Sequence, residues 1–179
     1  GDGGFDEFIG EGGDDIAWGE SGDDQMAGGS GADQLQGGDG NDRLQGDDGN
    51  DVLFGQAGND TLSGGEGNDY LLGGAGSDTY RIDALTDDDV VIDAEGTNTI
   101  EFGEGITLDQ LAFRQAVDGN GNSRYVSIVG GGGSGRVIVT GGMDGAVAQY
   151  KFADGSTLSA AEVATLASAA TNRPAQQLA

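Results

Sequence analysis

The sequence predicts an all-β chain whose first half is a parallel β-coil, and three regularities of its first 81 residues indicate this. Residues 1–81 divide without a gap into nine nonapeptides, the first being GDGGFDEFI and the last GGAGSDTYR. Every repeat has Gly at positions one and four and Asp at position six. Position eight is large and apolar in eight of the nine repeats, and Ala17 is the exception. One GxGxD alone would carry no weight, whereas nine in register predict a repeat architecture.

Each nonapeptide is expected to form a six-residue turn, GGxGxD, followed by a three-residue strand. Gly permits the positive φ angles that a tight turn requires. The strand sends its position-eight side chain inward and its two neighbours outward. Two repeats, eighteen residues, complete one coil, so the strands stack as two parallel sheets. Strain is expected where another residue replaces the second Gly, at Asp2, Glu11, Glu20, Asp47 and Gln56.

Aspartates eighteen residues apart are expected to line up in two columns along the coil, about 4.8 Å apart. One column is Asp6, Asp24, Asp42, Asp60 and Asp78, and the other is Asp15, Asp33, Asp51 and Asp69. Carboxylates at that spacing repel each other by about 1 kcal/mol even in water. Calcium between successive turns removes the conflict, because it binds about six to eight carboxylate and carbonyl oxygens. Five turns enclose four gaps and four turns enclose three, so about seven interior Ca²⁺ ions are expected, against a charge of −17 in residues 1–81.

The overall charge is strongly negative, with 32 acidic residues, 7 basic residues and no His. This composition excludes nucleic acid and an anionic membrane surface as partners, since both need clustered Lys and Arg. The chain has no Cys, so metal is expected to replace disulfides as the staple of an extracellular domain. No apolar stretch reaches the roughly 20 residues of a membrane span. The start on position one of a repeat, without Met, suggests a piece of a longer protein with neighbouring domains,. The chain is expected to be a monomer.

Residues 1–81 resemble the glycine-rich, Asp-bearing repeats of the RTX (repeats-in-toxin, haemolysin-type) family. The resemblance implies a right-handed, calcium-loaded parallel β-roll in a protein that bacteria secrete, commonly by a type I system. It also implies that each interior ion takes two position-six Asp side chains plus backbone carbonyls from positions one to four of neighbouring turns. The implied carbonyl ligands are those of Gly19, Ser21, Gly22, Gly28, Gly29, Ser30, Gly31, Gly37, Gly38, Asp39, Gly40, Gly46, Asp47, Asp48, Gly49, Gly55, Gln56, Ala57, Gly58, Gly64, Gly65, Glu66 and Gly67.

After residue 81 the phase breaks, and residues 82–106 are expected to continue the roll as degenerate repeats. Asp89 and Asn98 lie nine residues apart, each followed by β-branched residues, and are further candidate calcium ligands. The other acids of the turns, such as Asp14, Asp23, Asp39 and Asp48, are expected to face solvent by their side chains.

Residues 107–170 are expected to form a β-rich cap that covers the last coil, because an open stack exposes apolar core and unpaired edges. This segment resembles the β-rich region that commonly follows such repeats. Capping boxes at Thr107-x-x-Gln110 and Ser159-x-x-Glu162 predict a short turn and a helix to about Ala170, before a linker over 171–179. The predicted strands are Leu111–Gln115, Arg124–Val129, Arg136–Thr140 and Ala148–Phe152, with turns at Asp118–Asn122 and Gly130–Gly135,. Asp118–Asn122 lacks the Gly and Glu of an EF-hand and is expected to be a plain hairpin turn.

The composition and the repeats bear on three classes of function: catalysis, calcium-triggered folding, and recognition. Catalysis within this segment is not expected, because the chain has neither His nor Cys and its acids are evenly spaced,. The favoured function is a calcium-triggered folding and stabilising module of a large secreted or surface-bound bacterial protein of adhesin or toxin type. The alternatives are a calcium-dependent glycan- or surface-recognition module, or an accessory module of a secreted protease, lipase or alginate epimerase.

Overall fold

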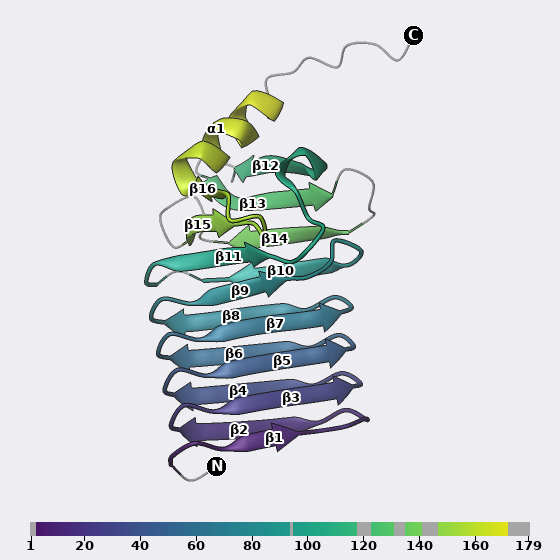
Figure 1. Cartoon of the computed structure of the whole chain (residues 1–179), viewed down its shortest axis with the longest axis vertical. Helices are drawn as coiled ribbons and strands as arrows, with labels where there is room; N and C mark the ends of the chain where they lie inside the picture. Colours follow the sequence, from purple (N-terminus) through teal and green to yellow (C-terminus); the bar gives the residue numbers. More distant parts are fainter. Residues whose placement is uncertain (1–2, 94, 118–122, 131–134, 141–146, 172–179) are drawn as a thin grey trace.

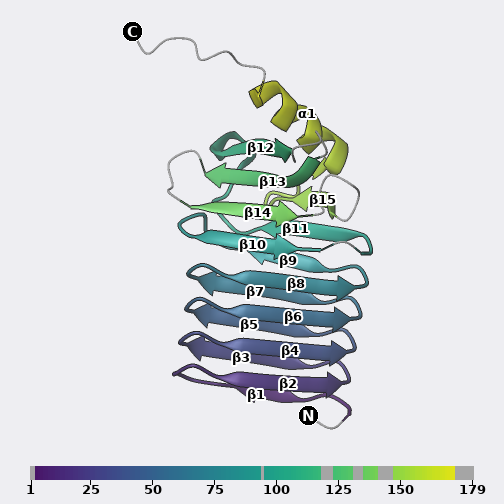
Figure 2. The ribbon, with the colours of Figure 1, turned by 180° about the vertical axis from the view of Figure 1, so that it is seen from behind.

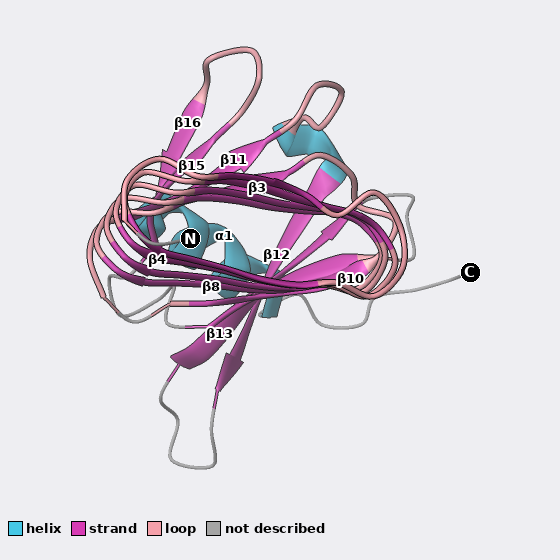
Figure 3. Ribbon diagram, turned by 90° about the horizontal axis from the view of Figure 1, so that it is seen from below, coloured by secondary structure: helices cyan, strands magenta, loops and turns pink. Residues whose placement is uncertain are grey.

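The chain forms a stack of flattened coils with strands along its two long sides and turns at its two ends (Figures 1 and 3). The structure is a computed structural model that describes residues 3–93, 95–117, 123–130, 135–140 and 147–171. The array holds β1 (Glu7–Ile9), β2 (Ile16–Ser21), β3 (Gln25–Ser30), β4 (Gln34–Asp39), β5 (Arg43–Asp48), β6 (Val52–Ala57), β7 (Thr61–Glu66), β8 (Tyr70–Ala75) and β9 (Thr79–Ile82). After it come β10 (Asp88–Ile92), β11 (Asn98–Phe102), a 3₁₀ turn (Leu108–Gln110), β12 (Leu111–Val117), β13 (Ser123–Gly130), β14 (Arg136–Thr140), β15 (Val147–Lys151), β16 (Thr157–Ser159) and α1 (Ala160–Thr171).

The strands form two eight-stranded sheets, one on each side of the stack (Figures 1 and 2). Sheet A has the order β1-β3-β5-β7-β9-β11-β15-β16, and sheet B has the order β12-β13-β14-β10-β8-β6-β4-β2. Within the array all pairs are parallel, and partners lie eighteen residues apart, as Leu35 and Leu53 do in sheet B. The predicted all-β fold, a parallel β-roll with one short C-terminal helix, is confirmed.

The interior strands are longer than predicted. Strands β2 to β8 each have six residues, from position seven to position three of the next repeat. The expected division into a six-residue turn and a three-residue strand is therefore wrong. The first three turn residues belong to the strand, and the second and third of them pair with the next coil, as Gly38 does with Gln56. Position two has positive φ in every repeat in which it is described, and four non-glycines adopt it: Glu20 (73°), Asp47 (73°) and Gln56 (81°) inside strands, and Glu11 (68°) between β1 and β2. These are four of the five positions where strain was expected, and the fifth, Asp2, lies outside the described residues.

The core of the array is a single file of position-eight side chains. Leu35, Leu44, Leu53, Leu62 and Leu71 are at most 1% exposed. Each contributes about 1.5–3 kcal/mol by its burial. Each repeat gains this free energy once, but it must order nine backbone residues at a cost of about 1–2 kcal/mol each. The burial of one side chain per repeat is therefore too small to offset the cost. The array therefore needs another source of stability.

Beyond β8 the coils lengthen by two residues but keep the sheets in register. Tyr70 pairs with Val90, and Thr79 pairs with Thr99, twenty residues on. β14 and β15 then add in parallel to β10 and β11, and β13, β12 and β16 follow antiparallel. The C-terminal strands thus extend both sheets of the roll.

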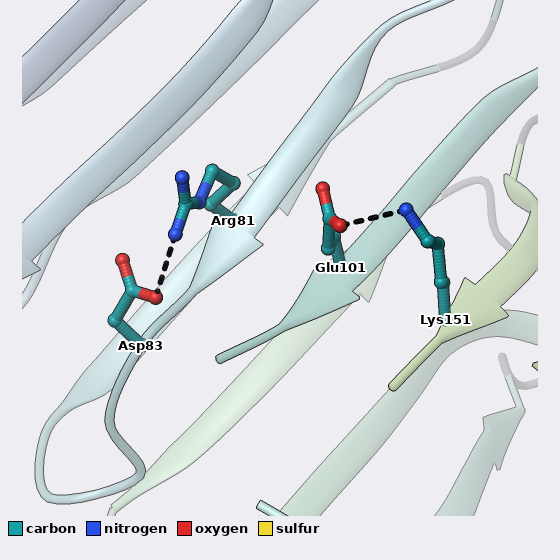
Figure 4. A network of polar contacts seen from close by, with 4 residues as sticks. All are labelled: Arg81, Asp83, Glu101 and Lys151. Carbon is teal, nitrogen blue, oxygen red and sulfur yellow. Dashed lines mark hydrogen bonds and ion pairs between the residues drawn. The ribbon is translucent and has the colours of Figure 1, made fainter. Parts of the chain in front are cut away.

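Ion pairs join the added strands to the last coils on both outer faces. Lys151 of β15 contacts Glu101 of β11 at 2.8 Å, close to the Arg81–Asp83 pair at 3.2 Å (Figure 4). Arg136 of β14 contacts Asp88 of β10 at 3.0 Å. These side chains are partly exposed, so each pair contributes at most about 1 kcal/mol.

Aromatic side chains of the C-terminal segment pack against one another and against the last coil. Phe102 stacks on Phe152 with ring centroids 5.1 Å apart, and Phe113 meets Tyr150 edge-on at 5.9 Å. The observed strands lie within two residues of the predicted bounds, and α1 extends one residue past the predicted end. The predicted turn at Asp118–Asn122, residues 131–134 of the predicted turn at Gly130–Gly135, and residues 172–179 of the linker predicted over 171–179 lie outside the described residues, whereas Thr171 is the last residue of α1.

Candidate metal centre

The stacking brings the position-six aspartates into two columns and ties one oxygen of each carboxylate from Asp24 to Asp78 to the preceding coil. The backbone N–H of Asp33 donates to Oδ1 of Asp51 at 2.8 Å, and that of Asp24 donates to Oδ1 of Asp42 at 2.8 Å. The same contact recurs along both columns of the array at 2.7–2.9 Å. Each carboxylate from Asp24 to Asp78 is therefore held in one orientation by the preceding coil.

The other oxygen of each carboxylate is buried without a hydrogen-bond partner among the described residues. This holds for Oδ2 of Asp6, Asp15, Asp24, Asp33, Asp42, Asp51, Asp60, Asp69 and Asp78. From Asp24 to Asp78 these residues are at most 2% exposed, whereas Asp6 and Asp15 in the first coil are partly exposed. A buried carboxylate oxygen without a partner is unfavourable by several kcal/mol unless a cation neutralises it.

Gly at position one keeps open the space beside each free oxygen. A Cβ on Gly46 would overlap Oδ2 of Asp51 and would lie 2.5 Å from the carbonyl oxygen of Gly64, in the next coil. A Cβ on Gly55 would likewise overlap Oδ2 of Asp60 and lie 2.7 Å from the carbonyl oxygen of Gly73. Position one is therefore Gly to admit converging oxygens, although its φ is not positive.

Burial raises the pKa of the interior carboxyl groups. It raises the pKa of Asp51 and Asp69 to about 6 and that of Asp60 to about 7, and neighbouring carboxylates in the column add to the effect. The pKa of Asp78 rises to about 6 by burial, with further contributions from Asp93. At neutral pH the columns thus hold charges that the protein interior disfavours and that a bound cation would stabilise.

The predicted carbonyl ligands differ in what surrounds them, according to their position in the repeat. At position three, Ser21, Asp39 and Ala57 accept the position-four N–H of the preceding coil at 2.7–2.8 Å. At position one, carbonyls such as those of Gly37 and Gly64 lie beside an unpartnered Oδ2. Within the described part of the chain, no three acidic side chains form one cluster. The arrangement therefore combines carboxylates with carbonyls, which is the donor set that Ca²⁺ prefers.

The two later candidates continue the columns. Oδ1 of Asp89 accepts the N–H of Asp69 at 3.1 Å, and Oδ1 of Asn98 accepts that of Asp78 at 2.7 Å. The amide of Asn98 donates to the carbonyl of Glu95 at 2.8 Å. Asp89 thus adds a carboxylate to its column, whereas Asn98 adds a neutral group.

Position five carries a second ladder that the sequence analysis missed. Oδ1 of Asp23 accepts the N–H of Asn41 at 2.7 Å, and Oδ1 of Asn41 accepts that of Asn59 at 2.9 Å. Asp14, Asn50, Asn59 and Asn68 make the same contact with the following coil. Asp14 and Asp23 are exposed as expected, but they also bond the backbone. The Gly-Asn-Asp triplet that recurs at residues 40–42, 49–51, 58–60 and 67–69 could have indicated this ladder in the sequence.

Position-four glycines are predicted to tolerate no side chain in the middle of the array. Gly49 has a φ of 151°, and a Cβ there would overlap the carbonyl oxygen of Gly31. Gly13 also has positive φ, 108°, but a Cβ there meets nothing within 4 Å. Gly13→Ala should cost about 1–3 kcal/mol through its backbone conformation. Gly49→Ala should lower the melting temperature in calcium clearly more than Gly13→Ala does, because the added methyl group would also push its coil away from the carbonyl of Gly31. Equal shifts for the two variants would contradict the packing described here.

Comparison with known proteins agrees with this geometry. The model of the RTX calcium-binding nonapeptide repeat matches in four copies, at residues 1–35, 28–62, 36–71 and 45–80. No curated protein matches the chain. Among the described residues, no helix is long and apolar enough to cross a membrane. Nine turns with a position-six carboxylate and a position-one glycine, stacked as a parallel roll, therefore place residues 1–80 in the RTX calcium-binding nonapeptide repeat family.

Proposed function

We propose that this chain is a calcium-triggered folding and stabilising module of a large secreted bacterial protein of adhesin or toxin type. The observation that carries the proposal is the set of nine buried Oδ2 atoms without a hydrogen-bond partner in the described chain. RTX repeats bind calcium and occur in secreted bacterial proteins. The donor set fits this ion, since the position-six carboxylates and position-one carbonyls are hard oxygen donors that glycine leaves accessible,.

The proposed role follows from the energetics of the array. A single file of apolar side chains does not match the ordering cost of a chain with 24 Gly in its first 81 residues,. The columns add charge repulsion to this cost. When a metal site exists only in the folded state, the binding free energy becomes folding free energy. The position-six aspartates would hold the ions between successive coils, with about seven sites in the nonapeptides.

The calcium dependence matches the difference between the inside and outside of a cell. Extracellular calcium modules bind with dissociation constants of roughly 10⁻⁴ to 10⁻³ M. A chain of this kind would stay unfolded in a low-calcium cytosol and fold after export. We propose no catalytic role for this segment, and the activity of a parent protein would come from other domains.

A calcium titration followed by circular dichroism tests the proposal. The β signal should be small in chelator at neutral pH and should rise cooperatively as free calcium passes through about 10⁻⁴ to 10⁻³ M. Magnesium should produce little of this signal, because it requires octahedral geometry and keeps its water. An unchanged spectrum on adding calcium would reject the proposal.

A further inference from the structure

The eleventh turn, residues 93–98, precedes β11 and carries its acid at a different position from the turns of the nine repeats. Its sequence is DAEGTN, with Asp93 at position one and Asn98 at position six. The register establishes these positions, because Ile92 pairs with Leu72, so that Asp93 corresponds to Gly73. Asn98 likewise accepts the N–H of Asp78, as a position-six residue does. The turn thus has an acid where the nine repeats have Gly, and an amide where they have Asp.

The side chain of Asp93 is buried and bonded to the ninth repeat. Asp93 is 4% exposed. The hydroxyl of Tyr80 donates to Oδ2 of Asp93 at 2.5 Å and accepts the N–H of Gly73 at 2.8 Å. Tyr80 occupies position eight of its repeat, where the neighbouring strands have Leu62 and Ile100. The Tyr80 ring lies in the core, and its hydroxyl bonds residues of the turns, a contact that an aliphatic side chain cannot make.

Two oxygens meet beside Gly73, and a third, from Asp93, is hydrogen-bonded to one of them. A Cβ on Gly73 would overlap both Oδ2 of Asp78 and the hydroxyl oxygen of Tyr80, which is bonded to Asp93. At Gly55, the equivalent glycine one coil earlier, the atom next to Oδ2 of Asp60 is the carbonyl oxygen of Gly73 in the following coil. The Tyr80 hydroxyl thus takes the place of a carbonyl donor.

Oδ2 of Asp78 points into this space and has no hydrogen-bond partner in the described chain, although Asp78 is fully buried. The carboxylates of Asp78 and Asp93 repel each other across it,. Asn98 bonds Asp78 and Glu95, and Asp93 accepts hydrogen bonds from the Tyr80 hydroxyl and the N–H of Glu95, but of these two side chains only Asp93 can carry a negative charge. Asp93 is therefore the group that supplies the second negative charge at this end of the column.

We propose that Asp78, Asp93 and Tyr80 form a calcium site that closes the column, in which the position-one carboxylate of Asp93 replaces the missing position-six carboxylate. This inference rests on the proposed function and adds to it one site outside the nonapeptide pattern. The site joins the array to the C-terminal segment, because Asp93 lies between β10 and β11, which pair with β14 and β15.

The test counts the calcium ions bound per chain by equilibrium dialysis, with the melting temperature measured in parallel. Asp93→Asn should bind one ion fewer than the parent, while the remaining sites keep their affinity within about twofold. Glu104→Gln removes the same charge from an exposed side chain and should leave the count unchanged. Tyr80→Phe keeps the ring in the core, and should weaken the same site.

A charge-relocating variant makes the test decisive. Asp93→Asn combined with Asn98→Asp returns the acid to position six and should restore the parental ion count. The proposal is overturned if Asp93→Asn binds as many ions as the parent with the same affinities, or if the double variant stays one ion short or fails to fold. If Asp93→Asn alone does not fold, the double variant decides by the same criterion. A parent that binds no calcium at all would instead reject the proposed function.

Discussion

Asp51→Asn is expected to stabilise the calcium-free roll and to weaken the calcium-bound one. Without calcium, the variant removes a buried charge from a column of like charges, and the amide oxygen can still accept the N–H of Asp33,. With calcium, it removes a charged ligand that two adjacent sites share. The calcium midpoint should rise by about tenfold, which is about 1.4 kcal/mol.

Circular dichroism titrations of the parent and of two further variants complete this experiment. Asp51→Ala also removes the acceptor of the Asp33 N–H, which costs about 1–3 kcal/mol more, so it should be destabilised in both conditions. Asp48→Asn removes an exposed charge three residues away and should shift neither titration by more than about twofold,. If Asp51→Asn moved both conditions in the same direction, Asp51 would not be a calcium ligand.

Acidification is expected to stabilise the calcium-free roll, as calcium does, but to a smaller extent. In the metal-free roll, burial raises the pKa of Asp51, Asp69, Asp78 and Asp89 to about 6 and that of Asp60 to about 7. Unfolded Asp has a pKa of about 3.9. Between about pH 4 and pH 7 the folded chain therefore binds more protons than the unfolded chain, and its stability rises as pH falls through this window.

The measurement is the β signal of calcium-stripped protein at pH 7.5 and at about pH 5. The signal should be larger at the lower pH. In calcium the order should reverse, because protons compete with the ion for the same oxygens. A metal-free signal that falls on acidification would contradict the burial of these carboxylates.

The repeat phase predicted the coil length, the parallel sheets, the core file and the two aspartate columns. Those features follow from a spacing of nine residues and from the inward direction of position eight. Strand length could not be predicted in the same way, because Gly38 and Asp39 look like turn residues although their backbone continues the ladder. The signal for a strand there is the neighbouring coil, which a single repeat does not contain.

The end of the array was harder to predict than its middle. Asp89 and Asn98 were found by their spacing from the repeats, and the structure places both in the columns. Asp93 was missed because an acid at position one matches no repeat, and Tyr80 was missed because it satisfied the apolar pattern of position eight. Two inserted residues per coil had also shifted the phase. Such a site depends on register between coils and becomes visible only once the strands are paired.

Position-resolved hydrogen exchange in calcium and in chelator, at neutral pH, tests the dependence of the roll on calcium most directly. The amides of Asp24, Asp33 and Asp51 donate to the next carboxylate of their columns, so their exchange reports the turns themselves. These amides should be strongly protected in calcium and should exchange at unfolded-chain rates in chelator. Equal protection of the three amides in both solutions would show that the roll folds without the ion.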